Sequence, residues 1–83
     1  MNRKKKLIFR CGHRGMKEMD LLLGGFAKAH VPSFDESQLN TFEELITNSD
    51  PDIYNWVTGK EIIPSQWDSE VSQLLLGFEL ENY

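Results

Sequence analysis

The stretch RGMKEMDLLLGGFAKAH, Arg14 to His30, carries the pattern that decides the fold of this 83-residue chain. Its apolar residues recur every three or four positions, as they do on one face of an α-helix. The members of this stripe are Met16, Met19, Leu23, Phe26 and Ala27. Gly24 and Gly25 lie within the stretch, and each costs a helix about 1 kcal/mol relative to alanine. We therefore expect a helix with a buried face that either meets a neighbouring helix closely at the glycines or bends there.

Pro32 interrupts this pattern, and a second helical pattern follows it. The sequence SFDE is typical of a capping box, in which Ser33 caps the new helix and Glu36 reaches back to the free amide of Ser33. The expected buried residues of this helix are Leu39, Phe42, Leu45 and Ile46.

A third helix is predicted from DPDIYNWVTG. Asp50 suits the N-cap, Pro51 suits the first helical position, and Gly59 suits a left-handed ending. The residues expected to face inward are Ile53, Trp56 and Val57.

The two ends of the chain also show helical patterns. A last helix is predicted to begin at Ser65, after a break at Pro64, and a short first helix is predicted from about Lys4 to Arg10. The stripe of the last helix is Trp67, Val71, Leu74, Leu75 and Phe78. The loop before it is expected to carry Ile62 and Ile63 into the core.

The fold class follows from these helices and from the lack of strand signals. No Asn-Gly or Asp-Gly turn stands between alternating residues. With 40% hydrophobic and 27% charged residues, the composition is that of an ordinary globular protein. We predict an all-α fold, a compact bundle of four to five short helices in a single domain spanning residues 1–83, with residues 1–6 as a flexible basic N-terminus.

Several function classes are disfavoured by composition. A single cysteine, Cys11, cannot form a disulfide framework or a multi-cysteine metal site. The apolar run Leu21 to Leu23 is far below the roughly 20 residues that cross a bilayer, so no membrane association is expected. Catalysis by Cys11 and His13 would also need an orienting partner and a concave pocket, and His13 and His30 lack metal-ligand spacing. We therefore predict no catalytic residues and no metal site.

Charge is distributed unevenly along the chain. Residues 1–28 contain eight basic and two acidic residues, and the remaining 55 contain one lysine and eleven acids, although the net charge is only −4. This layout suits a surface that meets one partner in one orientation. A nucleic-acid-binding or antitoxin-type role is the alternative, because seven bases precede residue 18. The negative net charge and the lack of a helix-turn-helix pattern argue against it, and no nucleic acid is expected as a partner.

Arg14 and Glu18 are four residues apart and would share one helix face. Gly15 lies between them and would leave a notch into which another backbone fits. A bidentate donor and a carboxylate acceptor on either side of a notch favour docking of another protein over chemistry.

Arg14 to Glu18 resembles the R-G-x-x-E motif of the succinate dehydrogenase assembly factors, the FAD assembly factor or flavinator family, of the bacterial SdhE type. The segments QLNTFEELI and DPDIYNW follow in the family's order and spacing, so the resemblance covers about residues 14 to 56. It implies a small helical chaperone, not an enzyme, that binds the flavoprotein subunit of succinate dehydrogenase, and in some bacteria of fumarate reductase. Such a factor promotes covalent attachment of FAD to a histidine of that subunit by an autocatalytic reaction in the partner, and it has no cofactor of its own.

The resemblance also implies a set of contact residues. Arg14, Gly15 and Glu18 would form the functional surface. The expected rim of this partner-binding surface is Arg10, His13, Lys17 and Asp20. His13 departs from the family pattern, where a basic Arg or Lys is common at this position, and protonation of His13 would partly restore that charge.

The sequence also leads to expectations for the cellular compartment and the oligomeric state of the protein. Met1 is followed directly by a chain of domain length, which favours a bacterial cytoplasm over a mitochondrial matrix. The free protein is expected to be a monomer.

Overall fold

The computed structural model describes residues 2–78, and within this range it contains five α-helices and two short 3-10 helices but no strand. The predicted all-α fold of four to five short helices is therefore confirmed. Contacts group the described residues into two compact units, residues 2–35 and 36–78.

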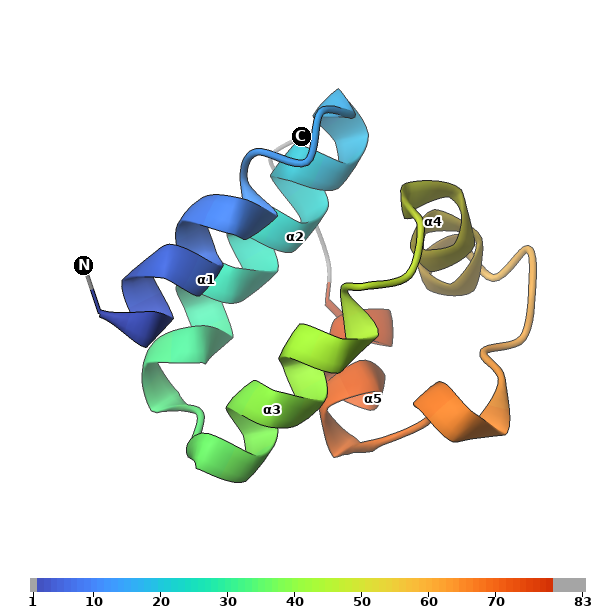
Figure 1. The fold of residues 1–83 in the computed structure, drawn as a ribbon. Helices are drawn as coiled ribbons and strands as arrows, with labels where there is room; N and C mark the ends of the chain where they lie inside the picture. The colour runs from blue at the N-terminus through green and yellow to red at the C-terminus, as the bar shows by residue number, and fades with distance from the viewer. Residues whose placement is uncertain (1, 79–83) are drawn as a thin grey trace. The chain divides into compact units, whose positions relative to one another are not determined.

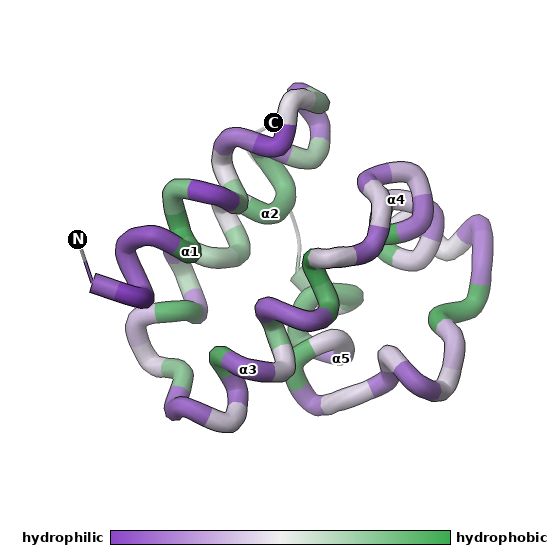
Figure 2. Tube along the Cα trace, in the orientation of Figure 1, coloured by the Kyte–Doolittle hydropathy of each residue, from purple (hydrophilic) through white to green (hydrophobic). Residues whose placement is uncertain are grey.

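The first unit is a helical hairpin of α1, Arg3–Cys11, and α2, Lys17–His30, followed by the 3-10 helix η1, Val31–Ser33. Figure 1 shows α1 in blue beside α2 in cyan, joined by a short loop at one end. Apolar residues are concentrated on α2, whereas the start of α1 is strongly hydrophilic (Figure 2). The fully buried core side chains of this unit include Leu7, Cys11, Met19, Leu23, Phe26 and Ala27. Met16, expected in the same stripe, is only half-buried.

Helix α1 confirms the predicted first helix, which begins at Arg3 rather than at about Lys4. Residues 3–6, which were also predicted to belong to a flexible basic N-terminus, form its first turn. Asn2 caps this turn, because its side-chain oxygen accepts a hydrogen bond from the Lys5 amide at 2.8 Å. The Lys4 ammonium also donates to the Pro32 carbonyl oxygen at 2.8 Å and so ties α1 to η1.

Gly24 confirms one of the two expectations for the glycine pair. A Cβ on Gly24 would lie 3.2 Å from the Cα of Gly12, so the end of α1 and the middle of α2 approach each other closely here. Helix α2 continues through both glycines. The cost of glycine in the helix is therefore offset by close packing of two backbones.

Ser33 does not start the next helix as predicted. It ends η1, and its hydroxyl donates to the His30 carbonyl oxygen at 3.0 Å. Ser33 is thus the last residue of the 3-10 helix, and the extended Phe34 follows it instead of a first helical turn. Helix α3, Glu36–Leu45, accordingly begins three residues later than the cap position that the capping-box pattern suggested.

The second unit contains α3, α4 (Asp50–Thr58), the 3-10 helix η2 (Ser65–Trp67) and α5 (Glu70–Leu76). Within it α5 packs against both α3 and α4. The expected core positions that are buried here are Leu39, Phe42, Leu45, Ile46, Ile53, Trp56, Val71 and Leu75. Gly59 ends α4 with φ 81°, which confirms the predicted left-handed cap.

The caps of α4 and α5 differ from the predicted caps by one and four residues. Ser49 rather than Asp50 caps α4, and Ser69 rather than Ser65 caps α5. Ser69 and Ser72 exchange side-chain to backbone hydrogen bonds, which makes a complete capping box, whereas Ser65 opens only a 3-10 turn.

Apolar residues at the loops of this unit are less buried than predicted. Ile62 is 94% exposed rather than part of the core, and Ile63 is only half-buried. Leu74 is 38% exposed. The other members of the predicted stripes that are half-buried are Val57, Trp67 and Phe78. Trp67 is only half-buried because α5 starts late. It lies in η2, outside α5, whereas its burial was predicted from the periodicity of that helix.

Candidate functional site

Residues 12–16, the motif loop, connect α1 to α2 and contain the first three residues of the R-G-x-x-E motif. Gly12 ends α1 through its amide, which bonds to the carbonyl oxygens of Ile8 and Phe9 at 3.2 and 3.1 Å. Helix α2 begins only at Lys17. The prediction that Arg14 and Glu18 share one helix face is therefore wrong, because Arg14 precedes the helix.

Asp20 holds the motif loop in place. Its Oδ1 atom accepts hydrogen bonds from the backbone amides of Arg14 at 2.5 Å and Gly15 at 3.2 Å. A carboxylate in the first turn of α2 also lies at the positive end of the helix dipole. Asp20 was predicted to belong to the partner-binding rim, and the structure shows that it also has an intramolecular role as the clamp of the loop. In the sequence, this clamp role is indicated by an acidic residue in the first turn of a helix that directly follows a glycine-containing loop.

Gly15 has φ 101°, a conformation that side-chain-bearing residues rarely adopt. No atom lies within 4 Å of the place where its Cβ would be, so the space beside it is open. The sequence predicted an open notch at Gly15 but attributed it to a glycine within a helix. The structure shows instead that the backbone itself requires glycine here.

The other motif and rim residues surround this loop. Arg14 is half-buried, whereas Glu18, Lys17 and Arg10 are exposed. His13 is exposed and stacks on Phe9, with ring centroids 4.0 Å apart and an angle of 16° between the rings. The structure thus joins Arg14 and Gly15 to Asp20 through hydrogen bonds.

His13 has a fixed orientation. Its Nδ1 atom lies 2.7 Å from the Phe9 carbonyl oxygen, a bond that Nδ1 donates. The stacking on Phe9 and this bond hold the imidazole against the last turns of α1.

Cys11 is fully buried beside the motif loop. Burial raises the pKa of its thiol to about 11, although the positive charges of Arg14 and Arg10 act in the opposite direction. The thiol is therefore protonated near neutral pH and packs as a small apolar side chain.

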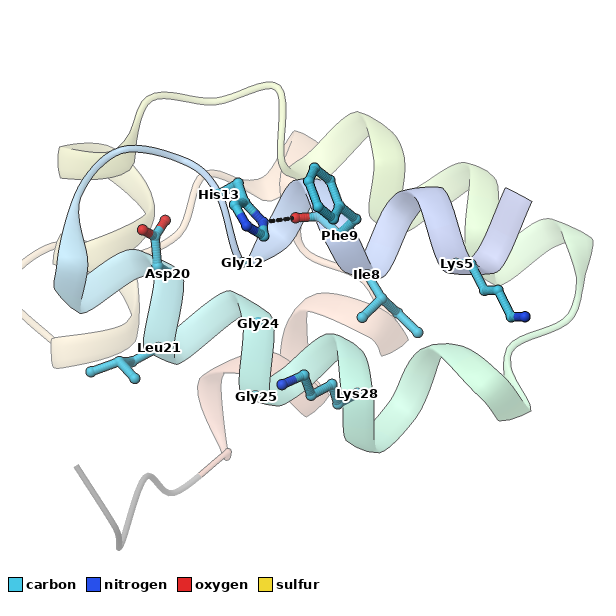
Figure 3. A pocket seen from close by; sticks show the side chains of 10 residues that line it. All are labelled: Lys5, Ile8, Phe9, Gly12, His13, Asp20, Leu21, Gly24, Gly25 and Lys28. Carbon is cyan, nitrogen blue, oxygen red and sulfur yellow. Dashed lines mark hydrogen bonds between the residues drawn. The ribbon is translucent and has the colours of Figure 1, made fainter. Parts of the chain in front are cut away.

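An open groove runs along α1 and α2 next to the motif loop (Figure 3). Its volume is about 610 Å³. Ile8, Phe9 and Leu21 contribute apolar side chains to it, and glycine backbone contributes at positions 12, 24 and 25. His13 and Asp20 lie at the end near the motif loop, and Lys5 and Lys28 lie toward the other end.

Sequence analysis did not find this groove. Phe9 is 55% exposed and Leu21 is 45% exposed, values that are high for large apolar side chains. Leu21 lies off the helical stripe of α2, and that offset is the signal that would have placed it on an outward surface.

Residues 2–78 contain neither a metal-binding cluster nor a membrane-spanning helix. No group of three or more His, Cys, Asp or Glu side chains is arranged to hold a metal ion. Within the same residues, every helix is too short or too polar to span a bilayer.

The family model described as "Flavinator of succinate dehydrogenase" matches residues 5–79, which include both units and the whole motif loop. The chain belongs to this flavinator family. The resemblance carried by the R-G-x-x-E and D-P-D-x-Y-x-W segments is thereby confirmed.

Curated relatives agree with this family. The chain is 42% identical over 72 residues to succinate dehydrogenase assembly factor 2, mitochondrial, of Dictyostelium discoideum, covering 87% of this chain and 51% of the relative. It is 40% identical over 75 residues to the protein of the same name of Drosophila grimshawi, covering 88% and 51%. It is 39% identical over 77 residues to that of Meyerozyma guilliermondii, covering 88% and 57%. The chain thus spans about half the length of these relatives. No solved structure matches it.

These names correct the predicted compartment. The relatives are named as mitochondrial proteins, so the predicted bacterial cytoplasm is wrong and the comparison points to mitochondria. The prediction rested on the position of Met1, which does not determine where a flavinator works. None of the relatives compared above is named as a nucleic-acid-binding or antitoxin protein.

Proposed function

We propose that this flavinator binds the flavoprotein subunit of succinate dehydrogenase and promotes covalent attachment of FAD to it. The main observation behind this proposal is that Asp20 holds the motif loop, which contains Arg14 and Gly15 of the family motif, in a defined conformation. Membership of the flavinator family over residues 5–79 supports the choice of partner. The names of the relatives, which are assembly factors, support a helper role rather than an enzymatic one.

The motif loop suits recognition of an anionic, closely approaching partner surface. The guanidinium of Arg14 can bind a carboxylate or another anion in the partner through two parallel hydrogen bonds. The open space at Gly15 lets the partner's backbone come close. Glu18, exposed in the first turn of α2, accepts hydrogen bonds from the partner.

The rim adds charge around this contact. Arg10 and Lys17 are exposed on either side of the motif loop, at the end of α1 and the start of α2. Such charges chiefly steer association and orient the two proteins. His13, held against Phe9, contributes a donor or a positive charge when protonated.

The contribution of this chain is positional. FAD and the histidine that receives it both belong to the flavoprotein, so the factor needs no cofactor of its own and the bond forms autocatalytically in the partner. Holding two reacting groups in the productive arrangement can supply a large part of a rate enhancement without any added nucleophile. The buried, protonated Cys11 is consistent with this division of roles.

We also propose that the factor is a monomer that associates transiently with its partner. The flavoprotein subunit of fumarate reductase is proposed as a second partner. Bipolar charge favours one orientation of docking. The two clients are distinguished by testing each purified flavoprotein separately.

In-gel fluorescence of the flavoprotein, in cells with and without this chain, tests the proposal directly. Covalent flavin should fall strongly without the chain, and Arg14→Ala or Glu18→Ala should not restore it. Arg14→Lys keeps the charge but loses bidentate binding, so it should restore flavin only partly. Glu44→Ala, which removes an exposed carboxylate from α3, is the matched control and should behave as wild type. Normal flavin in cells without the chain would refute the proposed function.

A further inference from the structure

Most of the groove along α1 and α2 lies outside the proposed contact of the motif loop, with which it shares His13 and Asp20. Its apolar side chains, Phe9 and Leu21, are 55% and 45% exposed, although they lie on well-formed helices. Concave sites that are lined mainly by apolar side chains, with a few polar groups among them, are typical of binding sites. The volume of about 610 Å³ falls within the roughly 300–1,000 Å³ of ligand-binding pockets.

The glycines contribute backbone rather than side chains to the lining of the groove. Gly12 and Gly24 let the backbones of α1 and α2 approach closely, so backbone rather than side chains lies between the two helices. A large apolar side chain from outside can therefore reach between Phe9 and Leu21 (Figure 3). Burial of such a side chain is the main source of affinity in a small contact of this type.

Charge indicates what accompanies the apolar side chain. Lys5 and Lys28 are both exposed and lie toward the end of the groove away from the motif loop. They come from the first half of α1 and the last turn of α2, which are neighbours because the two helices form a hairpin. Among residues 2–78, the only acid that lines the groove is Asp20, and it already binds the backbone of the motif loop. The lysine end is therefore complementary to carboxylates.

We propose that the groove is a second docking site, for a segment of the partner flavoprotein that carries a large apolar side chain followed by one or more acidic residues. This inference rests on the proposed function, because it assumes the same partner. His13 and Asp20 belong to both the groove and the surroundings of the motif loop, so one partner can occupy the two sites together. Two adjacent contacts fix the orientation of a partner better than one.

Affinity of the full chain for the purified flavoprotein subunit, measured by biolayer interferometry, tests the groove. Leu21→Ala should weaken binding about fivefold, because it removes apolar area that the partner would bury. Lys28→Glu should weaken binding about tenfold or more at low salt, and the loss should shrink at high salt. The matched controls are Leu74→Ala, a similarly exposed leucine on α5, and Lys6→Glu, which makes the same charge change on α1 outside the groove.

Both controls should bind within about twofold of wild type, a difference well below 1 kcal/mol. A photo-crosslinker placed at position 21 should in addition attach to a flavoprotein peptide that contains an apolar residue next to acids. Binding of the Leu21 and Lys28 variants as tight as that of wild type would overturn the groove assignment while leaving the proposed function intact. Failure of the wild-type chain to bind the flavoprotein would refute the proposed function itself.

Two other occupants give different results. If Leu21→Ala changes only self-association of the free chain, measured by sedimentation, the groove binds a second copy and the inference is wrong. If the wild-type chain binds duplex DNA and Lys28→Glu abolishes that binding but not binding to the flavoprotein, the lysines serve nucleic acid and the inference is also wrong.

Discussion

Gly15 and Gly59 form a matched pair of test positions. Both have positive φ, 101° and 81°, and no atom lies within 4 Å of either missing Cβ. Alanine at either site therefore meets no clash, and its cost comes from the backbone conformation alone. That cost is about 1–2 kcal/mol for a residue with a Cβ. Gly15 lies in the motif loop, whereas Gly59 caps α4 in the other unit.

Gly15→Ala and Gly59→Ala should consequently lose similar stability. For a domain of this size, about 1–2 kcal/mol corresponds to a fall in Tm of about 4–16 °C. Circular dichroism melting measures this fall, and in-gel fluorescence of the flavoprotein measures covalent flavin. We expect only Gly15→Ala to lower the rate of flavinylation, by about tenfold or more, because a methyl group there occupies the space into which the partner approaches.

The pair separates the two explanations of any loss. An equal loss of flavinylation in both variants would show that stability, not contact at the motif, limits activity. Flavinylation at the wild-type rate in Gly15→Ala would refute the placement of the contact at the motif loop. A Gly15→Ala variant with unchanged Tm would refute the argument from backbone conformation.

Three further outcomes are expected. Asp20→Ala should lower the free energy of unfolding by about 1.5–3 kcal/mol and should also lower flavinylation, because two loop amides lose a charged acceptor. Asp20→Asn keeps the acceptor oxygen and should retain most of the stability and most of the flavinylation. Urea unfolding measures the stability, and flavin fluorescence measures the flavinylation. Gly24→Ala should destabilise the hairpin by about 1–3 kcal/mol because the new methyl group meets backbone at 3.2 Å, whereas Gly77→Ala, with its nearest contact at 3.5 Å, should be close to neutral in the same unfolding experiment. The pKa of the Cys11 thiol is raised to about 11, so the folded state holds the proton more tightly than the unfolded state. The stability that this contributes is complete below about pH 9 and is lost as the pH rises through 11. Iodoacetamide should therefore label Cys11 at pH 8 only in denaturant, as mass spectrometry would show.

The all-α fold and most of the core were predictable from sequence because helical periodicity is a local property. Phe26, Phe42 and Val71, one from each of three predicted stripes, are buried, and Gly59 ends α4 in the left-handed conformation. Each of these features depends on residues within one or two helical turns. The family was predictable for a similar reason, since the motif and its spacing are read directly along the chain.

Helix starts were less predictable because several residues near each start can act as caps. Ser33 bonds back to a carbonyl, and Ser69, rather than Ser65, starts the last helix by forming a capping box with Ser72. Which serine caps depends on where the preceding loop leaves the chain, and Pro64 and Asp68 both adopt extended conformations that delay α5. Ile62 was placed in the core on hydrophobicity alone, but the loop that contains it leaves it 94% exposed.

The amino-acid sequence by itself determined the helices, their buried stripes, the family and the residues Arg14, Gly15 and Glu18 as candidates. The folded structure decided how they are presented: Asp20 clamps the loop, Gly15 needs its positive φ, and Arg14 lies before the helix rather than on it. It also created the groove, which arises only when two helices pack closely at glycine. Periodicity describes one helix at a time, whereas a clamp or a groove depends on the distance between two segments, and that distance is set by packing.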